Sequence, residues 1–87
     1  MASLPVAVRL ARALLDLREA HGVVTDDGVL HLTLPMNRKQ LASLISARPE
    51  TLSRAFEALA AAHVAYAHAR KVKVDDIDVL MDFARLA

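Results

Sequence analysis

Segment 35–59 constrains this 87-residue chain more than any other stretch, because it predicts two short helices separated by a tight turn. Asn37 and Gln40 stand at the spacing of a capping box, which favours a helix over residues 38–46. A second helix is expected over residues 49–62, since its opening proline suits a first helical turn. Two helices joined in this way form a helix-turn-helix.

The second of these helices has two chemically different faces. Its apolar residues recur at helical spacing and predict a buried side, formed by Leu52, Ala55, Phe56 and Leu59. The other side opens with short or forked polar groups that suit the edges of bases, namely Glu50, Thr51, Ser53 and Arg54. One face is therefore expected to anchor the helix while the other contacts a nucleic acid.

The charge distribution supports a polyanionic ligand, although the net charge of the chain is only +1. Residues 35–74 carry seven basic residues against two acidic ones, a net charge of +5. The rest of the chain carries four basic residues against eight acidic ones, a net charge of −4. A basic centre between acidic ends gives the molecule a sidedness that DNA would exploit, whereas an ordinary solvated surface is the alternative.

The flanking segments predict a small fold around the helix-turn-helix. The expected elements are, in chain order, a helix (5–20), a turn (25–28), a strand (29–34), the two helices above, a hairpin (64–66 with 71–74, turning near 67–70) and a last helix capped by Asp75. In the first helix of the motif we expect Leu41, Leu44 and Ile45 to be buried. The fold class is therefore mainly α with a small β-hairpin or sheet, a winged helix-turn-helix in a single domain over residues 1–87.

Several classes of function find no support in the sequence. The absence of cysteine excludes disulfides and thiolate metal sites within the chain and fits a reducing cytoplasm. None of the histidines has a ligand partner at helical spacing, and no nucleophile has a recognisable base, so we expect no metal, no cofactor and no enzymatic activity. No apolar run reaches membrane-spanning length and no signal peptide is present, which predicts a cytoplasmic protein.

Three strings resemble a known family. They are Arg-Leu-Ala-Arg-Ala-Leu-Leu at 9–15, Leu-Pro-Met-Asn-Arg-Lys-Gln-Leu-Ala at 34–42, and Glu-Thr-Leu-Ser-Arg at 50–54. In this order they resemble the C-terminal DNA-binding domain of the cyclic-AMP receptor / fumarate-nitrate regulator (Crp/Fnr) family, over nearly the whole chain. The resemblance implies a bacterial transcription regulator that binds a palindromic operator in double-stranded DNA as a dimer.

The resemblance also assigns roles to individual residues. It implies that Glu50, Ser53 and Arg54 read bases. Pro49 and Ser53 depart from the cyclic-AMP branch, which brings the match closer to the fumarate-nitrate branch, whose half-site resembles TTGAT. Two further departures are Arg48, where a capping Ser or Thr is expected, and Ala69, near the wing tip where the family often has Gly.

The remaining polar residues of the basic centre are candidate phosphate contacts, which position a protein on DNA without specifying sequence. They are Arg38, Lys39, Arg48, Thr51, Arg70, Lys71 and Lys73. For the arginines and lysines a solvated side chain without a ligand is the alternative, and for Thr51 the alternative is a residue that simply favours the first helical turn. For Glu50 and Arg54 the alternative is an exposed ion pair within the helix.

Two questions stay open at the level of the whole chain. Members of the family carry an N-terminal β-barrel effector domain and a long dimerisation helix, and neither fits in 87 residues. We therefore expect an excised C-terminal domain, which would be a homodimer in its full-length context, rather than a stand-alone relative. The alternative function is a winged helix for protein–protein interaction, in which an apolar patch including Ala58, Ala61 and Ala62 pairs with another subunit or with RNA polymerase.

Overall fold

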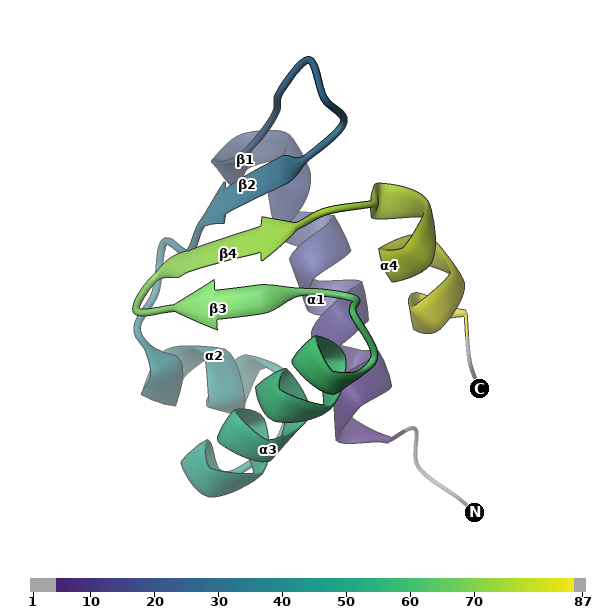
Figure 1. The fold of residues 1–87 in the computed structure, drawn as a ribbon. Helices are drawn as coiled ribbons and strands as arrows, with labels where there is room; N and C mark the ends of the chain where they lie inside the picture. Colours follow the sequence, from purple (N-terminus) through teal and green to yellow (C-terminus); the bar gives the residue numbers. More distant parts are fainter. Residues whose placement is uncertain (1–4, 86–87) are drawn as a thin grey trace.

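The fold was obtained as a computed structural model, which describes residues 5–85 (Figure 1). Helices and a small sheet alternate along the chain. The elements are α1 (Val6–His21), β1 (Gly22–Val24), β2 (Leu30–Thr33), α2 (Arg38–Leu44), α3 (Pro49–Ala61), β3 (Tyr66–His68), β4 (Lys71–Val74) and α4 (Ile77–Ala84). The predicted fold class, helices with a small sheet in a winged helix-turn-helix, is confirmed.

The strands form one antiparallel sheet in the order β1-β2-β4-β3. Alternate residues of the two central strands face inward and are buried, namely Leu30, Leu32, Val72 and Val74. Helix α1 lies behind the sheet, and α2 and α3 lie beneath it (Figure 1). Among the described residues no polar or charged side chain is buried, so the core is held by apolar burial, at roughly 25 cal/mol per Å² of apolar surface.

Strand β1 was not predicted from the sequence. The expected turn at residues 25–28 is present, but it joins β1 to β2, since Thr25 donates its backbone N–H to the carbonyl of Val29 and Gly28 has a φ of 84°. Val23 and Val24 are both exposed, at 66% and 56% of their surface. A three-residue edge strand without a buried face leaves no alternation of apolar and polar residues to detect.

The hairpin was predicted, but its first strand lies two residues later than expected. The first strand is Tyr66–His68 and not 64–66. Val64 and Ala65 are instead buried where the chain leaves α3. Its turn consists of Ala69 and Arg70 alone, since His68 pairs with Lys71. Ala69 has a φ of 53°, so alanine stands at a hairpin-turn position where glycine is usual.

Helix α2 begins as predicted and ends two residues earlier. The Asn37–Gln40 capping box is formed in both directions, with N···O distances of 2.8 and 3.0 Å. The helix ends in a Schellman motif, since Ala47 donates to the carbonyl of Ala42 at 2.8 Å and Ser46 has a φ of 56°. Leu44, predicted to be buried, is 59% exposed, whereas Leu41 and Ile45 are buried as expected.

Two arginines of α1 hold the ends of other helices. The Nε of Arg9 donates to the carbonyl of Ile45 at 2.9 Å, and the Nε of Arg12 donates to the carbonyl of Ala84 at 2.7 Å. These carbonyls lie at the C-terminal ends of α2 and α4, where a positive charge is favourable. At the other end of α4 the N-cap is Asp76, not the predicted Asp75, because the Asp76 carboxylate accepts from the N–H of Asp78 at 2.9 Å.

Candidate nucleic-acid interface

Helix α3 separates its buried and exposed residues as the sequence predicted. Leu52, Ala55, Phe56 and Leu59 are buried on one side. The opposite side carries Glu50, Ser53 and Arg54, all exposed, and Glu57 continues the same stripe one turn further on. These residues follow one another at i, i+3, i+4 and i+7, so their side chains share one helix face.

The polar groups of this face are not paired with one another. Residues 5–85 form two ion pairs, Lys73–Asp75 and Arg85–Asp82. Neither of them involves Glu50 or Arg54. The alternative of an ion pair within the helix is therefore not realised in this conformation. The carboxylate of Glu50 and the guanidinium of Arg54 are both exposed to solvent and accessible to a ligand.

The N-terminal end of α3 carries two further candidates. Arg48 is the N-cap residue, with an extended backbone and no hydrogen bond from its side chain to the helix, and Pro49 follows at the first helical position. Arg48 is exposed and Thr51 is half-buried. Together with the base-reading candidates, these residues fall within the first two turns of α3.

A second group of candidates surrounds the turn between β3 and β4. Arg38 at the start of α2 donates from Nη2 to the carbonyl of Ala69 at 3.4 Å, and its Cζ lies 4.4 Å from the centre of the Phe56 ring. Lys39, the next residue of α2, is exposed, and so is Arg70 in the turn. No sequence pattern indicated the contact between Arg38 and Phe56, because the two residues belong to different helices.

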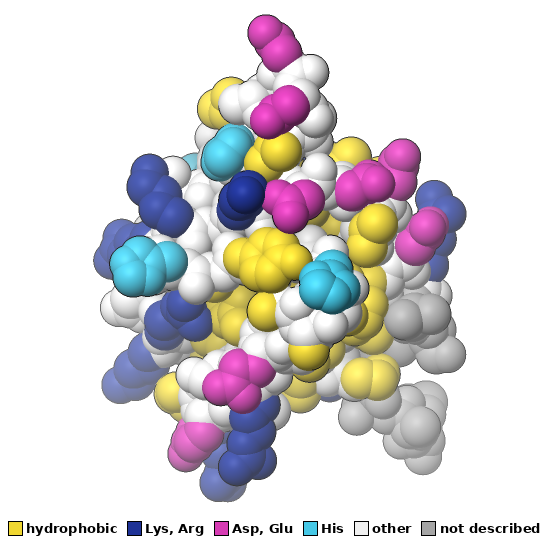
Figure 2. Space-filling view, viewed as in Figure 1, with side chains coloured by type: hydrophobic (Ala, Val, Ile, Leu, Met, Phe, Trp, Pro, Cys, Tyr) yellow, Lys and Arg dark blue, Asp and Glu magenta, His cyan; other side chains and the backbone are white. Residues whose placement is uncertain are grey.

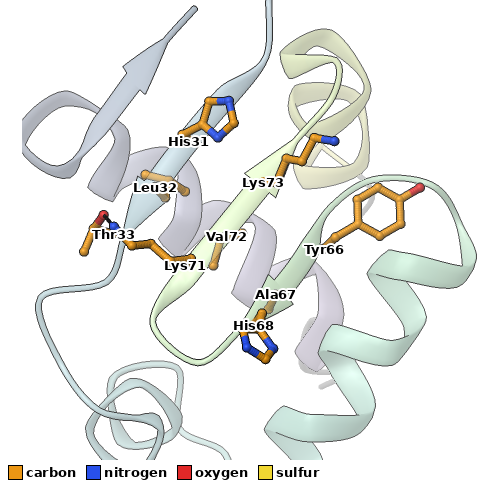
Figure 3. Close-up of a pocket in the computed structure, with 9 residues that line it drawn as sticks. All are labelled: His31, Leu32, Thr33, Tyr66, Ala67, His68, Lys71, Val72 and Lys73. Atoms are coloured by element: carbon orange, nitrogen blue, oxygen red, sulfur yellow. Dashed lines mark hydrogen bonds between the residues drawn. The ribbon is translucent and has the colours of Figure 1, made fainter.

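The two lysines of β4 have different neighbours on the outer face of the sheet (Figure 3). Lys71, next to the turn, donates from Nζ to the hydroxyl of Thr33 at 3.0 Å. Lys73 lies further from the turn and pairs with Asp75, with an Nζ···Oδ1 distance of 3.3 Å. Around them His31, Tyr66 and His68 help to line an open cavity of about 530 Å³. The exposed Lys73–Asp75 ion pair contributes at most about 1 kcal/mol, so a phosphate can displace Asp75 as the partner of Lys73.

The surface is divided by charge (Figure 2). Lysines and arginines gather at the left of the view, over the β3–β4 turn and α2, and at the bottom over α3, where acidic side chains lie beside them. Acidic side chains predominate over the β1–β2 loop at the top and over α4 at the right. In the loop, the hydroxyl of Thr25 and the N–H of Val29 donate to the Asp27 carboxylate and lower its pKa. The sidedness predicted from the sequence is therefore present in the fold.

Residues 5–85 hold neither a metal-binding cluster nor a helix that could span a membrane. Residues 5–85 contain no cluster of three or more histidine, cysteine or acidic side chains arranged to hold a metal ion. Within those residues no helix combines the length and the apolar character needed to cross a bilayer.

A helix-turn-helix with an exposed polar face, followed by a basic hairpin, defines the class of winged helix-turn-helix proteins. The family model described as the Crp-like helix-turn-helix domain matches residues 8–83. The chain belongs to this family and is a DNA-binding domain of a transcription regulator. The Crp/Fnr resemblance drawn from the sequence is thereby confirmed.

Individual relatives agree with the family assignment. The chain is 35% identical over 79 residues to the "Probable transcriptional regulator flp" of Lacticaseibacillus casei. The matched region covers 91% of this chain and 33% of that protein. A solved structure of a proposed cyclic nucleotide binding protein from Ruegeria pomeroyi matches the whole chain with a TM-score of 0.79 and 30% identity. A transcriptional regulator of the CRP/FNR family from Thermus thermophilus matches 90% of the chain with a TM-score of 0.75 and 24% identity.

The relatives are longer than this chain. The match covers 36% of the Ruegeria protein and 39% of the Thermus protein, so the chain spans little more than a third of the length of these relatives.

Proposed function

We propose that this domain binds DNA sequence-specifically, with α3 as the recognition helix in the major groove. The observation that supports this most is the exposed stripe of Glu50, Ser53 and Arg54 opposite the buried face of α3. The major groove of B-DNA is about 12 Å wide and about 8.5 Å deep, enough to admit one α-helix with its side chains. The buried face holds the helix on the domain while the polar face meets the bases.

Each side chain of the stripe has a distinct chemistry for a base edge. The guanidinium fork of Arg54 matches the O6 and N7 acceptors of guanine, and the Glu50 carboxylate accepts from the N4 amino group of cytosine. Each good contact of this kind provides about 1 to 3 kcal/mol of discrimination against a wrong base. The Ser53 hydroxyl can either donate or accept, so it tolerates more than one base.

Phosphate contacts would fix the domain on the duplex around this helix. Arg48 and Thr51 lie at the N-terminal end of α3, where the helix dipole favours an anion. Lys39 lies at the start of α2, and Arg70 and Lys71 lie at the β3–β4 turn. Arg38 and Lys73 complete the set proposed from the sequence, although both already have partners within the protein.

The domain would act as part of a longer transcription regulator. The regulator would bind a palindromic operator as a homodimer in the bacterial cytoplasm and would act on transcription through RNA polymerase, without a catalytic activity of its own. The domain would be the C-terminal part of a longer protein with an N-terminal effector domain, in keeping with the greater length of its relatives.

The protein–protein alternative gains no support from α3. Ala58, Ala61 and Ala62 are exposed, but the large apolar residues exposed within residues 5–85 are Val23, Val24, Leu44 and Val79, none of which belongs to α3. A docking helix needs larger apolar anchors than alanine to displace water usefully.

Sequence reading by α3 is tested by fluorescence anisotropy with a duplex carrying a TTGAT-type palindrome and with a scrambled duplex. The wild-type domain is expected to prefer the palindrome, and Arg54→Ala is expected to remove about 1 to 3 kcal/mol of that preference. Lys39→Ala is the matched control, since it should weaken binding to both duplexes equally. Equal losses on both duplexes for Arg54→Ala would contradict base reading, and no binding to either duplex at low salt would favour the protein-interaction alternative.

A further inference from the structure

Arg38 makes contacts with two other parts of the helix-turn-helix and wing, although it was proposed from the sequence as a phosphate contact. It is the first residue of α2 and is half-buried. Its Cζ lies 4.4 Å from the centre of the Phe56 ring in α3, and its Nη2 donates to the carbonyl of Ala69 at 3.4 Å. One side chain thus connects α2, α3 and the β3–β4 turn.

Both contacts of Arg38 are to groups whose position matters for DNA. Phe56 is 7% exposed and lies on the anchoring face of α3, directly behind the stripe that carries Ser53 and Arg54. Ala69 is the first residue of the two-residue turn and holds a positive φ of 53° without being glycine. On its other side the turn is held by the N–H of Leu34, which donates to the carbonyl of Arg70 at 2.8 Å.

We propose that Arg38 is a positioning residue that holds the β3–β4 turn at a fixed place relative to α3. Base contacts from α3 and phosphate contacts from the turn are then made together, because neither element has to be ordered on binding. The inference rests on the proposed function for its effect on DNA affinity, but the positioning itself is a property of the free protein.

The chemistry of the two contacts requires arginine rather than any cation. The planar guanidinium stacks its face on the ring while an edge N–H reaches the carbonyl. A lysine ammonium is compact and strongly hydrated, so it cannot make the flat stack and the edge contact at the same time. A phosphate contact made by charge alone would accept either residue. Arg38→Lys therefore separates the two roles while keeping the net charge.

The experiment measures Arg38→Lys with Lys39→Arg as its matched control, an opposite exchange at the neighbouring exposed position. In the free protein, hydrogen exchange by NMR compares the amide of Leu34, bonded to the turn, with that of Leu52, bonded to Arg48 within α3. We expect Arg38→Lys to speed exchange at Leu34 several-fold relative to Leu52. Lys39→Arg should leave the ratio unchanged. An unchanged ratio in Arg38→Lys would overturn the proposal.

The second arm measures DNA binding of the same variants by anisotropy at two salt concentrations. Arg38→Lys should bind the palindrome about fivefold more weakly with the salt slope unchanged, since the charge is retained and the positioning is lost. Wild-type affinity in Arg38→Lys would show that charge alone matters and would overturn the effect on DNA. If the wild-type domain shows no preference for the palindrome, the proposed function fails, and the hydrogen-exchange arm still decides the positioning.

Phe56→Leu provides an independent check, because it removes the ring and keeps an apolar side chain. If Arg38 acts through the stack, Phe56→Leu should change the Leu34 exchange ratio in the same direction, and the double variant should add little to either single one. Full additivity would contradict the coupling between the two residues. Should Phe56→Leu fail to fold, Arg38→Lys decides alone.

Discussion

At the scale of single residues, the helix-turn-helix contains a backbone conformation that its sequence does not favour. Ser46 ends the Schellman motif after α2 with a φ of 56°, a region in which a side chain costs roughly 1 kcal/mol relative to glycine. Ser46→Gly should therefore raise the free energy of unfolding by about 0.5 to 1 kcal/mol, measured by urea denaturation. Ser43→Gly is the control, because Ser43 lies in α2 with a helical backbone. Glycine at this position should lower the free energy of unfolding by up to about 1 kcal/mol. Stabilisation by both variants would show that the left-handed conformation is not the cause.

Arg48 stands at a position of α3 where another side chain would stabilise the helix. It occupies the N-cap of α3 without capping it, where Ser, Thr, Asp or Asn would accept a hydrogen bond from the helix. Arg48→Ser should raise the free energy of unfolding by about 1 kcal/mol. If Arg48 contacts phosphate, the same change should reduce the slope of log K against log salt by about 0.9. A stabilised variant with an unchanged slope would remove Arg48 from the phosphate set.

At the scale of elements, the wing should contribute affinity rather than specificity. Lys71 lies next to the turn of the β3–β4 hairpin, whereas Lys73 is further along the strand and paired with Asp75. Lys71→Ala should weaken binding to palindromic and scrambled duplexes by the same factor and reduce the salt slope by about 0.9. Lys73→Ala should have a smaller effect on both quantities, because Lys73 is further from the turn. Loss of preference for the palindrome in Lys71→Ala would mean that the wing reads sequence.

How much could be predicted also differs from element to element. The start of α2 and both faces of α3 were predictable, because capping chemistry and helical periodicity are local in sequence. The end of α2 was not, since Ser46 lacks the usual glycine signal. Leu44 was predicted to be buried from its apolar side chain within α2, and it is exposed. Strand β1 has no buried face, and the hairpin turn has alanine where glycine would mark it. The contact between Arg38 and Phe56 depends on tertiary packing, which no local pattern encodes.

At the scale of the whole molecule, the division of charge should orient the domain before it touches DNA. The basic centre and the acidic ends lie on different sides of the fold, and the acidic β1–β2 loop is distant from α3 in Figure 1. Repulsion of the acidic side and attraction of the basic side favour encounters with α3 and the wing facing the duplex. Salt should therefore slow association more than it speeds dissociation, since steering acts over a Debye length of about 10 Å at 0.1 M.

The size of the interface predicts what a single copy can achieve. One recognition helix covers one half-site, and dimeric proteins of this class engage two half-sites about 34 to 36 Å apart. Two copies joined by flexible linkers to a dimeric coiled coil should bind a palindrome about 10²- to 10⁴-fold more tightly than one copy, because the second contact becomes intramolecular. Anisotropy with the joined and single forms measures this gain. Moving the half-sites apart by about 5 base pairs, half a helical turn, is the control that places them on opposite faces of the duplex. A gain that survives this change would come from charge or from DNA-independent association and not from two α3 helices in successive major grooves.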